Sequence, residues 1–304
     1  QRRQQLRVVG EPAAVLGHSV GEIAAAAVAG VLSEDDALRL AVARGRLMQS
    51  LPTGGEAGGG GMLAAFAPAS AVEPHLDASL SVAGLNGPAN TVVAGPVAAL
   101  DALAGRLGKA GVESRRLAVS HGFHSALLDP ILPELERIAG GFVMNRPAIP
   151  VVSNLTGRPH ESFDAGYWRD HARHAVRFED GLRAVAELGC DAFLEIGPQP
   201  VLSGLGAAVL EDAAFLPSLR RGIADDEQIA GTLGRLYERG AAIDWRAVHR
   251  DGAGRRCSAP TYRFQRRRYW LDLPETVQGA SPPAPVETAA TGSDLVFDFY
   301  DGLT

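Results

Sequence analysis

The sequence predicts an α/β protein in which a small subdomain is inserted into a larger one. Apolar stretches of strand length alternate with segments of helical periodicity through most of the chain. Two regions with this alternation, residues 1–60 and 120–221, flank a third, 61–119, in which the elements follow a different order. The 304 residues are enough for two such units, at roughly 150 residues per domain.

The first region begins with a strand, a tight turn and a helix. A short apolar stretch precedes Gly17-His-Ser-Val-Gly21, and an alanine-rich run follows it. A second helix is predicted over residues 33–49, because Ser33 can cap its N-terminus and three acidic residues follow in the first turn. Six glycines in residues 53–61 then predict a loop that ends this region.

The inserted region, 61–119, predicts four strands and two helices. Its order is strand, helix, two strands, helix and strand, which is the βαββαβ order of a ferredoxin-like subdomain. The predicted elements are strand 62–66, helix 69–76, two strands separated at residues 86–90, helix 96–110 and strand 114–119.

Residues 120–221 return to the alternation of the first region. The predicted elements are helix 131–138, strand 149–153, helix 178–188, strand 192–196 and helix 201–210. Residues 222–272 contain a helical stretch and then arginines interleaved with aromatic rings, which we expect to dock on a neighbouring domain. Residues 273–304 have the composition of a Pro/Ala-rich linker and the start of a following region.

Composition excludes several classes of function. A net charge of −6 provides no basic surplus for nucleic acid, and 46% hydrophobic residues indicate a folded chain. The longest apolar run, residues 23–32, is too short to cross a bilayer, and the polar and basic residues 1–7 are not followed by the apolar core of a signal peptide. We therefore expect a cytoplasmic protein without membrane contact. Cys190 and Cys257 lack the paired spacing of a metal site, and we expect no metal.

Ser19 is a candidate nucleophile. It lies at the centre of Gly17-His-Ser-Val-Gly21, which fits the nucleophile elbow, a strained turn between a strand and a helix that exposes a serine hydroxyl. The amides at the start of the following helix can stabilise an oxyanion. The alternative interpretation is an ordinary glycine-rich loop between a strand and a helix.

Two further features favour chemistry at Ser19. His121 and His124 follow a predicted strand, where a general base is expected in an α/β fold, although loop histidines are also common on polar surfaces. Arg44 lies on the apolar face of helix 33–49, and a charge on a buried face needs an anionic partner. That partner can be a glutamate of the protein or the carboxylate of a ligand.

Together these residues resemble the acyltransferase domain of modular type I polyketide synthases, which is related to malonyl-CoA:ACP transacylases. The resemblance extends from Glu11 to about Asp272, and its end resembles the linker that follows such domains. It implies an α/β-hydrolase-like large subdomain with an inserted ferredoxin-like subdomain. The matching motifs are Gly17-His-Ser-Val-Gly-Glu22, Ala43-Arg-Gly-Arg-Leu-Met-Gln49, Gly84-Leu-Asn-Gly-Pro88, Ser120-His-Gly-Phe-His124, Arg177-Phe178, Glu195-Ile-Gly-Pro198 and Tyr262 to Asp272.

The resemblance implies a role for each site residue. Ser19 is the acylated nucleophile, His124 is its base, and Arg44 binds the free carboxylate of the extender unit. The backbone carbonyl of His171 orients the imidazole of His124. The other residues implied to contact substrate are Val20, whose amide donates to the oxyanion, and His121, Phe123 and Asn86.

The resemblance also implies substrate, partners and cofactors. The domain moves a malonyl unit from malonyl-CoA to the phosphopantetheine thiol of an acyl carrier protein, beside a ketosynthase and other synthase domains, and binds no cofactor of its own. Phe123 and Val20 favour malonyl, because methylmalonyl enzymes usually have a smaller residue at the first position and glutamine at the second. A methylmalonyl-specific enzyme is the alternative.

Two other functions are compatible with a serine at such a turn: a hydrolase and a non-catalytic scaffold. A hydrolase of neutral esters has no use for Arg44, and the chain shows no clear candidate for the acid that follows the serine in the hydrolase order Ser, Asp or Glu, His. The family also has a Gly-Gln-Gly segment before the nucleophile, and only 18 residues precede Ser19. We therefore expect a fragment of a longer polypeptide that lacks the N-terminal part of its core, and a catalytically incompetent scaffold fragment is the second alternative.

Overall fold

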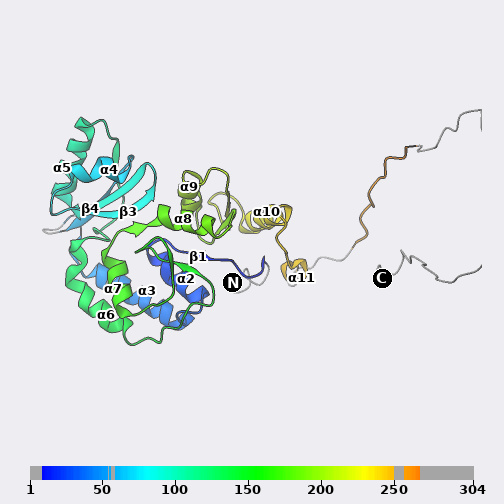
Figure 1. Ribbon diagram of the computed structural model, residues 1–304, viewed down its shortest axis with the longest axis horizontal. Coiled ribbons are helices and arrows are strands. Elements are labelled where there is room, and N and C mark those ends of the chain that lie inside the picture. Colours follow the sequence, from blue (N-terminus) through cyan, green and yellow to red (C-terminus); the bar gives the residue numbers. More distant parts are fainter. Residues whose placement is uncertain (1–8, 54, 56–58, 250–256, 268–304) are drawn as a thin grey trace, which may run out of the picture. The chain divides into compact units, whose positions relative to one another are not determined.

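The computed structural model describes residues 9–53, 55, 59–249 and 257–267. The chain divides into two units, residues 1–252 and 253–304, and all helices and strands described below belong to the first (Figure 1). In the second unit residues 257–267 are exposed, and the rings of Tyr262 and Phe264 contact each other. The predicted linker 273–304 and part of the predicted loop 53–61 lie outside the described residues.

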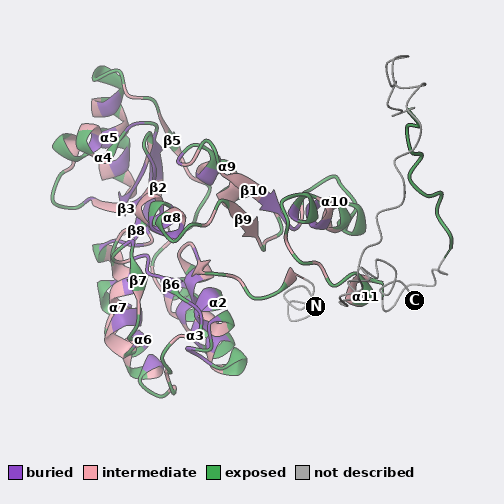
Figure 2. Cartoon of the chain, turned by 45° about the vertical axis from the view of Figure 1, so that its right-hand side comes forward, coloured by how far each residue is buried: buried purple, intermediate pink, exposed green. Residues whose placement is uncertain are grey.

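The large subdomain begins with β1 (Val15–Leu16), which pairs in parallel with β6 (Val151–Val152). Strand β6 also pairs with β7 (Pro159–His160), and this pair is antiparallel. The helical elements of this subdomain share one hydrophobic core (Figure 2). They are α2 (Val20–Val28), α3 (Glu34–Gln49), the 3₁₀ helix η2 (Ala126–Ile131), α6 (Leu132–Ala139) and α7 (Ala165–Arg173).

Helix α3 forms as its sequence predicts. The side chain of Ser33 accepts a hydrogen bond of 3.0 Å from the amide of Asp36, which caps the helix. The buried residues of the helix are Ala37, Leu40, Arg44 and Met48, spaced three or four apart along a single stripe. The stripe therefore carries a guanidinium group into the protein interior.

The inserted subdomain has the predicted ferredoxin-like order. Strands β5 (Ser114–Arg116), β2 (Gly60–Ala65), β4 (Asn90–Pro96) and β3 (Ser81–Gly87) lie side by side in that order, and each pair is antiparallel. Helix α5 (Val97–Lys109) buries three leucines against the sheet, and α4 (Ala69–Val72) with the 3₁₀ helix η1 (Glu73–His75) completes the layer. Burial of one leucine contributes about 1.5–3 kcal/mol.

One strand of this sheet comes from outside the inserted region. Strand β8 (Val176–Arg177) pairs in parallel with β3, so the sheet continues into the large subdomain. The local sequence does not predict this strand, because its pairing partner β3 lies in the inserted region, far from it along the chain. Helix α8 (Phe178–Glu187) follows it directly.

The remaining elements form a two-stranded parallel sheet and its helices. Strands β9 (Ala192–Glu195) and β10 (Ala214–Pro217) pair across the connecting helix α9 (Val201–Ala207). Helices α10 (Asp225–Glu238) and α11 (Trp245–Val248) come next. Among all helices in the described residues, none has the length and apolar character needed to span a bilayer.

The sequence pattern does not predict α7 or β10 either. Helix α7 has a recognisable start, because the side chain of Asp164 accepts a hydrogen bond from the amide of Tyr167. Its buried residues include Tyr167, Trp168 and His171, which lie on one face. Aromatic and histidine side chains made this stripe less obvious than a run of leucines. The helix is important because its C-terminal end reaches the site.

Candidate active site

Ser19 occupies a strained turn between β1 and α2. Its backbone has φ +52°, a value that residues with a side chain rarely adopt. A Cβ atom at Gly17 would lie 2.1 Å from the amide nitrogen of Glu22, so a glycine is required there. A Cβ atom at Gly21 would meet nothing within 4 Å. The elbow therefore depends on the first glycine of the motif and not on the second.

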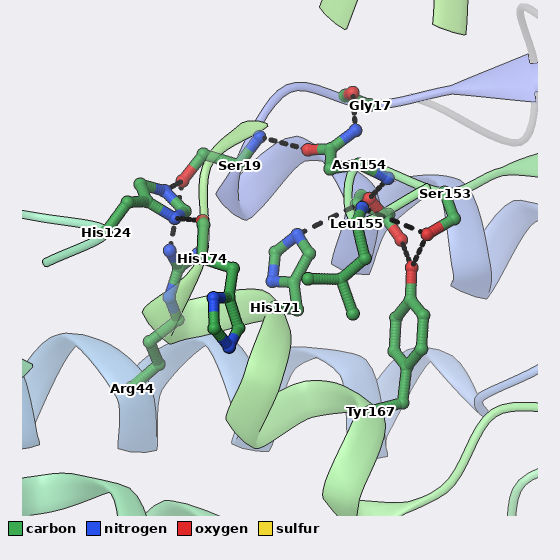
Figure 3. Close-up of polar contacts among 11 residues, drawn as sticks. Gly17, Ser19, Arg44, His124, Ser153, Asn154, Leu155, Tyr167, His171 and His174 are labelled. Atoms are coloured by element: carbon green, nitrogen blue, oxygen red, sulfur yellow. Dashed lines mark hydrogen bonds and ion pairs between the residues drawn. The ribbon is translucent and has the colours of Figure 1, made fainter. Parts of the chain in front are cut away.

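Ser19 and His124 form a hydrogen-bonded pair. The Oγ of Ser19 lies 2.7 Å from the Nε2 of His124 (Figure 3). The Nδ1 of His124 donates a hydrogen bond of 2.8 Å to the backbone carbonyl of His174. This bond leaves Nε2 as the acceptor for the serine proton. The geometry is that of a nucleophile with its general base.

The predicted orienting residue, His171, is wrong. The carbonyl that holds His124 belongs to His174, which follows the last residue of α7 and has an extended backbone. His171 lies one turn earlier, inside the helix, where its carbonyl points along the helix axis. Its side chain is buried, with Nε2 at 3.4 Å from the Oε2 of Glu22.

The environment keeps the imidazole of His124 neutral. Burial holds the pKa of His124 well below its ordinary value, and the positive charge of Arg44 lowers it further. Electrostatic interactions with His171 and His18 act in the same direction, and the bond to the His174 carbonyl opposes them. A neutral imidazole can accept the Ser19 proton at and below pH 7.

Arg44 reaches the same point from α3. Its Nη2 donates a hydrogen bond of 3.0 Å to the Oγ of Ser19, and its Nε is buried without a partner. Burial lowers the pKa of Arg44 to about 10, and the charge of Glu22 partly opposes this shift. Arg44 is therefore a cation at neutral pH. Among the described residues no carboxylate hydrogen-bonds to it or forms an ion pair with it, and Glu22 acts on it only through its charge.

The resemblance implies four further contacts with substrate. Val20 is exposed and is the first residue of α2, and an amide at this position has no acceptor within the helix. Phe123 is half-buried and packs against the large core. Asn86 accepts a hydrogen bond of 2.8 Å from the Nε2 of His18. The ring nitrogens of His121 are both engaged, one by the carbonyl of Leu51 and one by the hydroxyl of Ser120.

His18 was not singled out from the sequence. It lies next to Ser19, and its ring contacts Phe178 edge to face. Burial lowers the pKa of His18, although its bond to Asn86 opposes that change. Its neutral ring joins the elbow to β3 of the inserted subdomain. Adjacency to the nucleophile was the signal that could have identified it.

A buried polar network lies behind the nucleophile. Asn154 hydrogen-bonds to both sides of the elbow, and its own amide donates to the carboxylate of Glu22. The hydroxyl of Tyr167 contacts Glu22 and Ser153 (Figure 3). Burial and the charge of Glu22 raise the pKa of Tyr167. The sequence does not single out Asn154 and Tyr167, because neither belongs to a catalytic or binding motif.

Among the residues that the structure describes, no acid hydrogen-bonds to His124, and no group of metal ligands is present. Both ring nitrogens of His124 are accounted for by Ser19 and His174. Within the described ranges, no three His, Cys, Asp or Glu side chains are placed to hold a metal ion. The arrangement is a Ser-His dyad beside a buried cation, which suits nucleophilic attack on an acyl group that carries a negative charge.

Comparison with known proteins gives consistent matches. Residues 4–242 match the family model of the acyl transferase domain. Mycoketide-CoA synthase of Mycobacterium tuberculosis is 42% identical over 267 residues, which are 86% of this chain and 6% of that protein. The chain thus spans a small part of that relative.

Two solved structures are similar in fold as well as sequence. The acyltransferase domain from the second module of the salinomycin polyketide synthase matches with a TM-score of 0.79 and 43% identity, over 85% of this chain and 61% of that one. The malonyl CoA-acyl carrier protein transacylase of Clostridium perfringens matches with a TM-score of 0.70 and 25% identity, over 76% of this chain and 73% of that one.

Proposed function

The chain belongs to the acyl transferase domain family and is an acyltransferase related to those of polyketide synthases, and from this premise we propose which acyl group it moves and how. It transfers a malonyl unit from malonyl-CoA to the phosphopantetheine thiol of an acyl carrier protein. The transfer passes through an acyl ester on Ser19. The protein supplies all catalytic groups, and the reaction needs no metal or redox cofactor.

The position of Arg44 carries the proposal. A buried guanidinium with an unpartnered Nε lies against the nucleophile, with Nη2 at 3.0 Å from Oγ. A planar guanidinium binds a carboxylate through two parallel hydrogen bonds. A malonyl group has a carboxylate at a fixed distance from its thioester carbon. Binding of that carboxylate therefore places the carbonyl beside Ser19.

The dyad supports a double displacement. His124 accepts the proton of Ser19 as the hydroxyl oxygen attacks the thioester, and the amide of Val20 donates to the developing oxyanion. The C–S bond then breaks, and the proton on His124 passes to the departing thiolate of CoA. In the second half the carrier thiol transfers its proton to His124 and attacks the acyl-serine. Ser19 recovers its proton when the ester bond breaks.

The choice of malonyl over methylmalonyl rests on Phe123 and Val20. Phe123 is held against the core, so its bulk near the dyad cannot move away freely. A single methyl group is worth about 1–3 kcal/mol in such a pocket, which sets the expected preference at about 10- to 200-fold. An enzyme that selects methylmalonyl is the alternative, and competition between the two donors separates them.

The partners follow from the same reaction. The acceptor is an acyl carrier protein, and a ketosynthase is the neighbouring domain that uses the loaded unit. The intact geometry of Ser19, His124 and Arg44 argues against the scaffold alternative, because a chain freed from catalysis has no reason to keep a buried cation against a serine.

Intact-mass spectrometry tests the proposal. The purified chain is incubated briefly with equal concentrations of malonyl-CoA and methylmalonyl-CoA, and Ser19→Ala is the control. A malonyl adduct that is absent from the alanine variant supports the nucleophile and the donor together. A methylmalonyl adduct contradicts the choice of donor alone, and no adduct on a folded chain supports the scaffold alternative.

A further inference from the structure

We propose that Asn154 is a positioning residue that holds the nucleophile elbow in its reactive conformation, with Glu22 fixing Asn154 in turn. The inference rests on the proposed acyl-serine mechanism and adds to it a residue that contacts neither substrate nor the reacting atoms. Asn154 acts through the backbone on both sides of Ser19.

The side chain of Asn154 spans the turn. Its Oδ1 accepts a hydrogen bond of 2.8 Å from the amide of Ser19, and its Nδ2 donates one of 2.8 Å to the carbonyl of Gly17 (Figure 3). The residue is buried, so water cannot replace either bond. The side-chain amide group of Asn154 therefore fixes the backbone of both Ser19 and Gly17.

The sheet topology places Asn154 at this point. Strands β1 and β6 are parallel, with Leu16 opposite Val152. Their carboxyl ends meet at the same edge of the sheet, and the elbow follows β1 as Asn154 follows β6. The amide thus acts as a bridge from the end of one strand to the turn that leaves the other.

The elbow needs such support because its conformation is unfavourable by itself. Ser19 has φ +52°, and strained residues persist only where the surrounding structure holds them. The bond to Asn154 also occupies the amide of Ser19, so this amide cannot donate to substrate. The amide of Val20, at the start of α2, remains available for the oxyanion.

A second layer holds Asn154 itself. The backbone amide of Asn154 donates a hydrogen bond of 2.7 Å to the Oε2 of Glu22. The other carboxylate oxygen of Glu22 contacts the hydroxyl of Tyr167. Glu22 is fully buried in the first turn of α2, three residues after Ser19. The contacts therefore close a ring from Ser19 through Asn154 to Glu22 and back along the helix. A shift of Asn154 has to move the start of the helix with it.

The test compares Asn154→Ala with Ser153→Ala in the full chain. Ser153 is equally buried and hydrogen-bonds to Tyr167, but in the described part of the chain its side chain makes no hydrogen bond to residues 17–21. A fluorophosphonate probe reports the nucleophile alone, because the serine oxygen displaces fluoride from phosphorus and His124 takes the proton. Single-turnover loading from malonyl-CoA gives two separate quantities: the maximal loading rate and the malonyl-CoA concentration for half-maximal loading. Both are measured at temperatures at which circular dichroism shows each variant folded.

We expect Asn154→Ala to slow labelling and the maximal loading rate by about 10- to 100-fold, as misplacement of a nucleophile does. The malonyl-CoA concentration for half-maximal loading should stay within about threefold, since Arg44 is untouched. Ser153→Ala should label at close to the wild-type rate. Equal rates for Asn154→Ala and wild type overturn the inference, whereas absence of labelling at Ser19 in the wild type overturns the proposed mechanism.

Asn154→Asp provides a test that a purely structural role does not pass. A protonated carboxyl group can accept from the Ser19 amide and donate to the Gly17 carbonyl, but an ionised one cannot donate. The groups that face this region are Glu22 and Tyr167 beside Asn154, and Arg44, His18 and His171 around His124. Because the pKa of His124 is held low, labelling is measurable at acidic pH.

The labelling rate of Asn154→Asp, relative to wild type, should therefore be highest at low pH and fall as pH rises and the new carboxyl group ionises. A ratio that does not change with pH contradicts the proposal that the Asn154 side chain holds the elbow. This measurement also decides the matter if Asn154→Ala does not fold.

Discussion

Arg44 donates a hydrogen bond to the oxygen of Ser19, so a buried cation and the nucleophile are in direct contact. The contact joins α3 to the turn before α2, and it leaves the Nε of Arg44 without a partner. We therefore expect Arg44 to influence which acyl-CoA donor is used and at which pH His124 is neutral.

Arg44→Ala should remove the preference for a charged donor. A hydrogen bond to a charged group contributes about 1.5–3 kcal/mol, so the ratio of malonyl-CoA to acetyl-CoA loading should fall by about 10- to 100-fold. Single-turnover loading with each donor measures this ratio. Arg46→Ala removes an exposed arginine from the same helix and serves as the control. An equal loss with both donors would contradict a role in carboxylate binding.

The same arginine should set the acid limit of the reaction. Its charge helps to hold the pKa of His124 low, so its loss raises that pKa. The base works only when neutral, and the acid limb of the rate should move to higher pH in Arg44→Ala. His171 and His18 also face the imidazole and remain in place. Fluorophosphonate labelling between pH 4 and 8 measures the shift, and Arg44→Lys, which retains the charge, should show a smaller one.

The two glycines of the elbow should respond in opposite ways. Gly17→Ala places a Cβ atom 2.1 Å from backbone, which cannot be relieved by a side-chain movement, and should lower the free energy of unfolding by about 1–3 kcal/mol or more. Gly21→Ala has free space in a helix and should raise it by up to about 1 kcal/mol. Urea denaturation measures both. Equal destabilisation by the two changes is the contrary result.

Tyr167 should make the fold sensitive to alkali. Burial and Glu22 raise its pKa in the folded state above the value of about 10 expected when unfolded. A group with a raised folded pKa contributes stability below its unfolded pKa, and this contribution is lost as pH rises above it. Tyr167→Phe removes the hydroxyl that contacts Glu22 and Ser153, so the variant should be less stable than wild type at pH 7. Above pH 10 its free energy of unfolding should fall less than that of wild type, because it lacks the ionisable group. Tyr237→Phe, at an exposed position, is the control for urea denaturation against pH.

Phe123→Ser should change the choice of extender. A smaller side chain leaves room for the α-methyl group, and the ratio of methylmalonyl to malonyl loading should rise by about tenfold or more. The competition experiment measures it directly. Since Phe123 packs against the core, thermal denaturation must accompany it. An unchanged ratio on a folded variant contradicts the role of Phe123.

Local patterns predicted much of this molecule. The elbow follows from a strand, a glycine and a helix close together in the chain, and Arg44 from the periodicity of α3. The βαββαβ order predicted the arrangement of β5, β2, β4 and β3. Local patterns did not predict β8 and β10, whose pairing with β3 and β9 is defined only by the tertiary structure.

What the sequence determined by itself are the features encoded by neighbouring residues: the turn that presents Ser19, the burial of Arg44 and the resemblance that implies His124 as base. Tertiary structure decided which groups hold them. The carbonyl at His124 comes from His174 and not His171, because only the residue beyond the end of α7 turns its carbonyl out of the helix. The hydrogen bond between Ser19 and Asn154 joins positions 135 residues apart. Such contacts depend on how strands and helices meet in space, and spacing along the chain does not specify them.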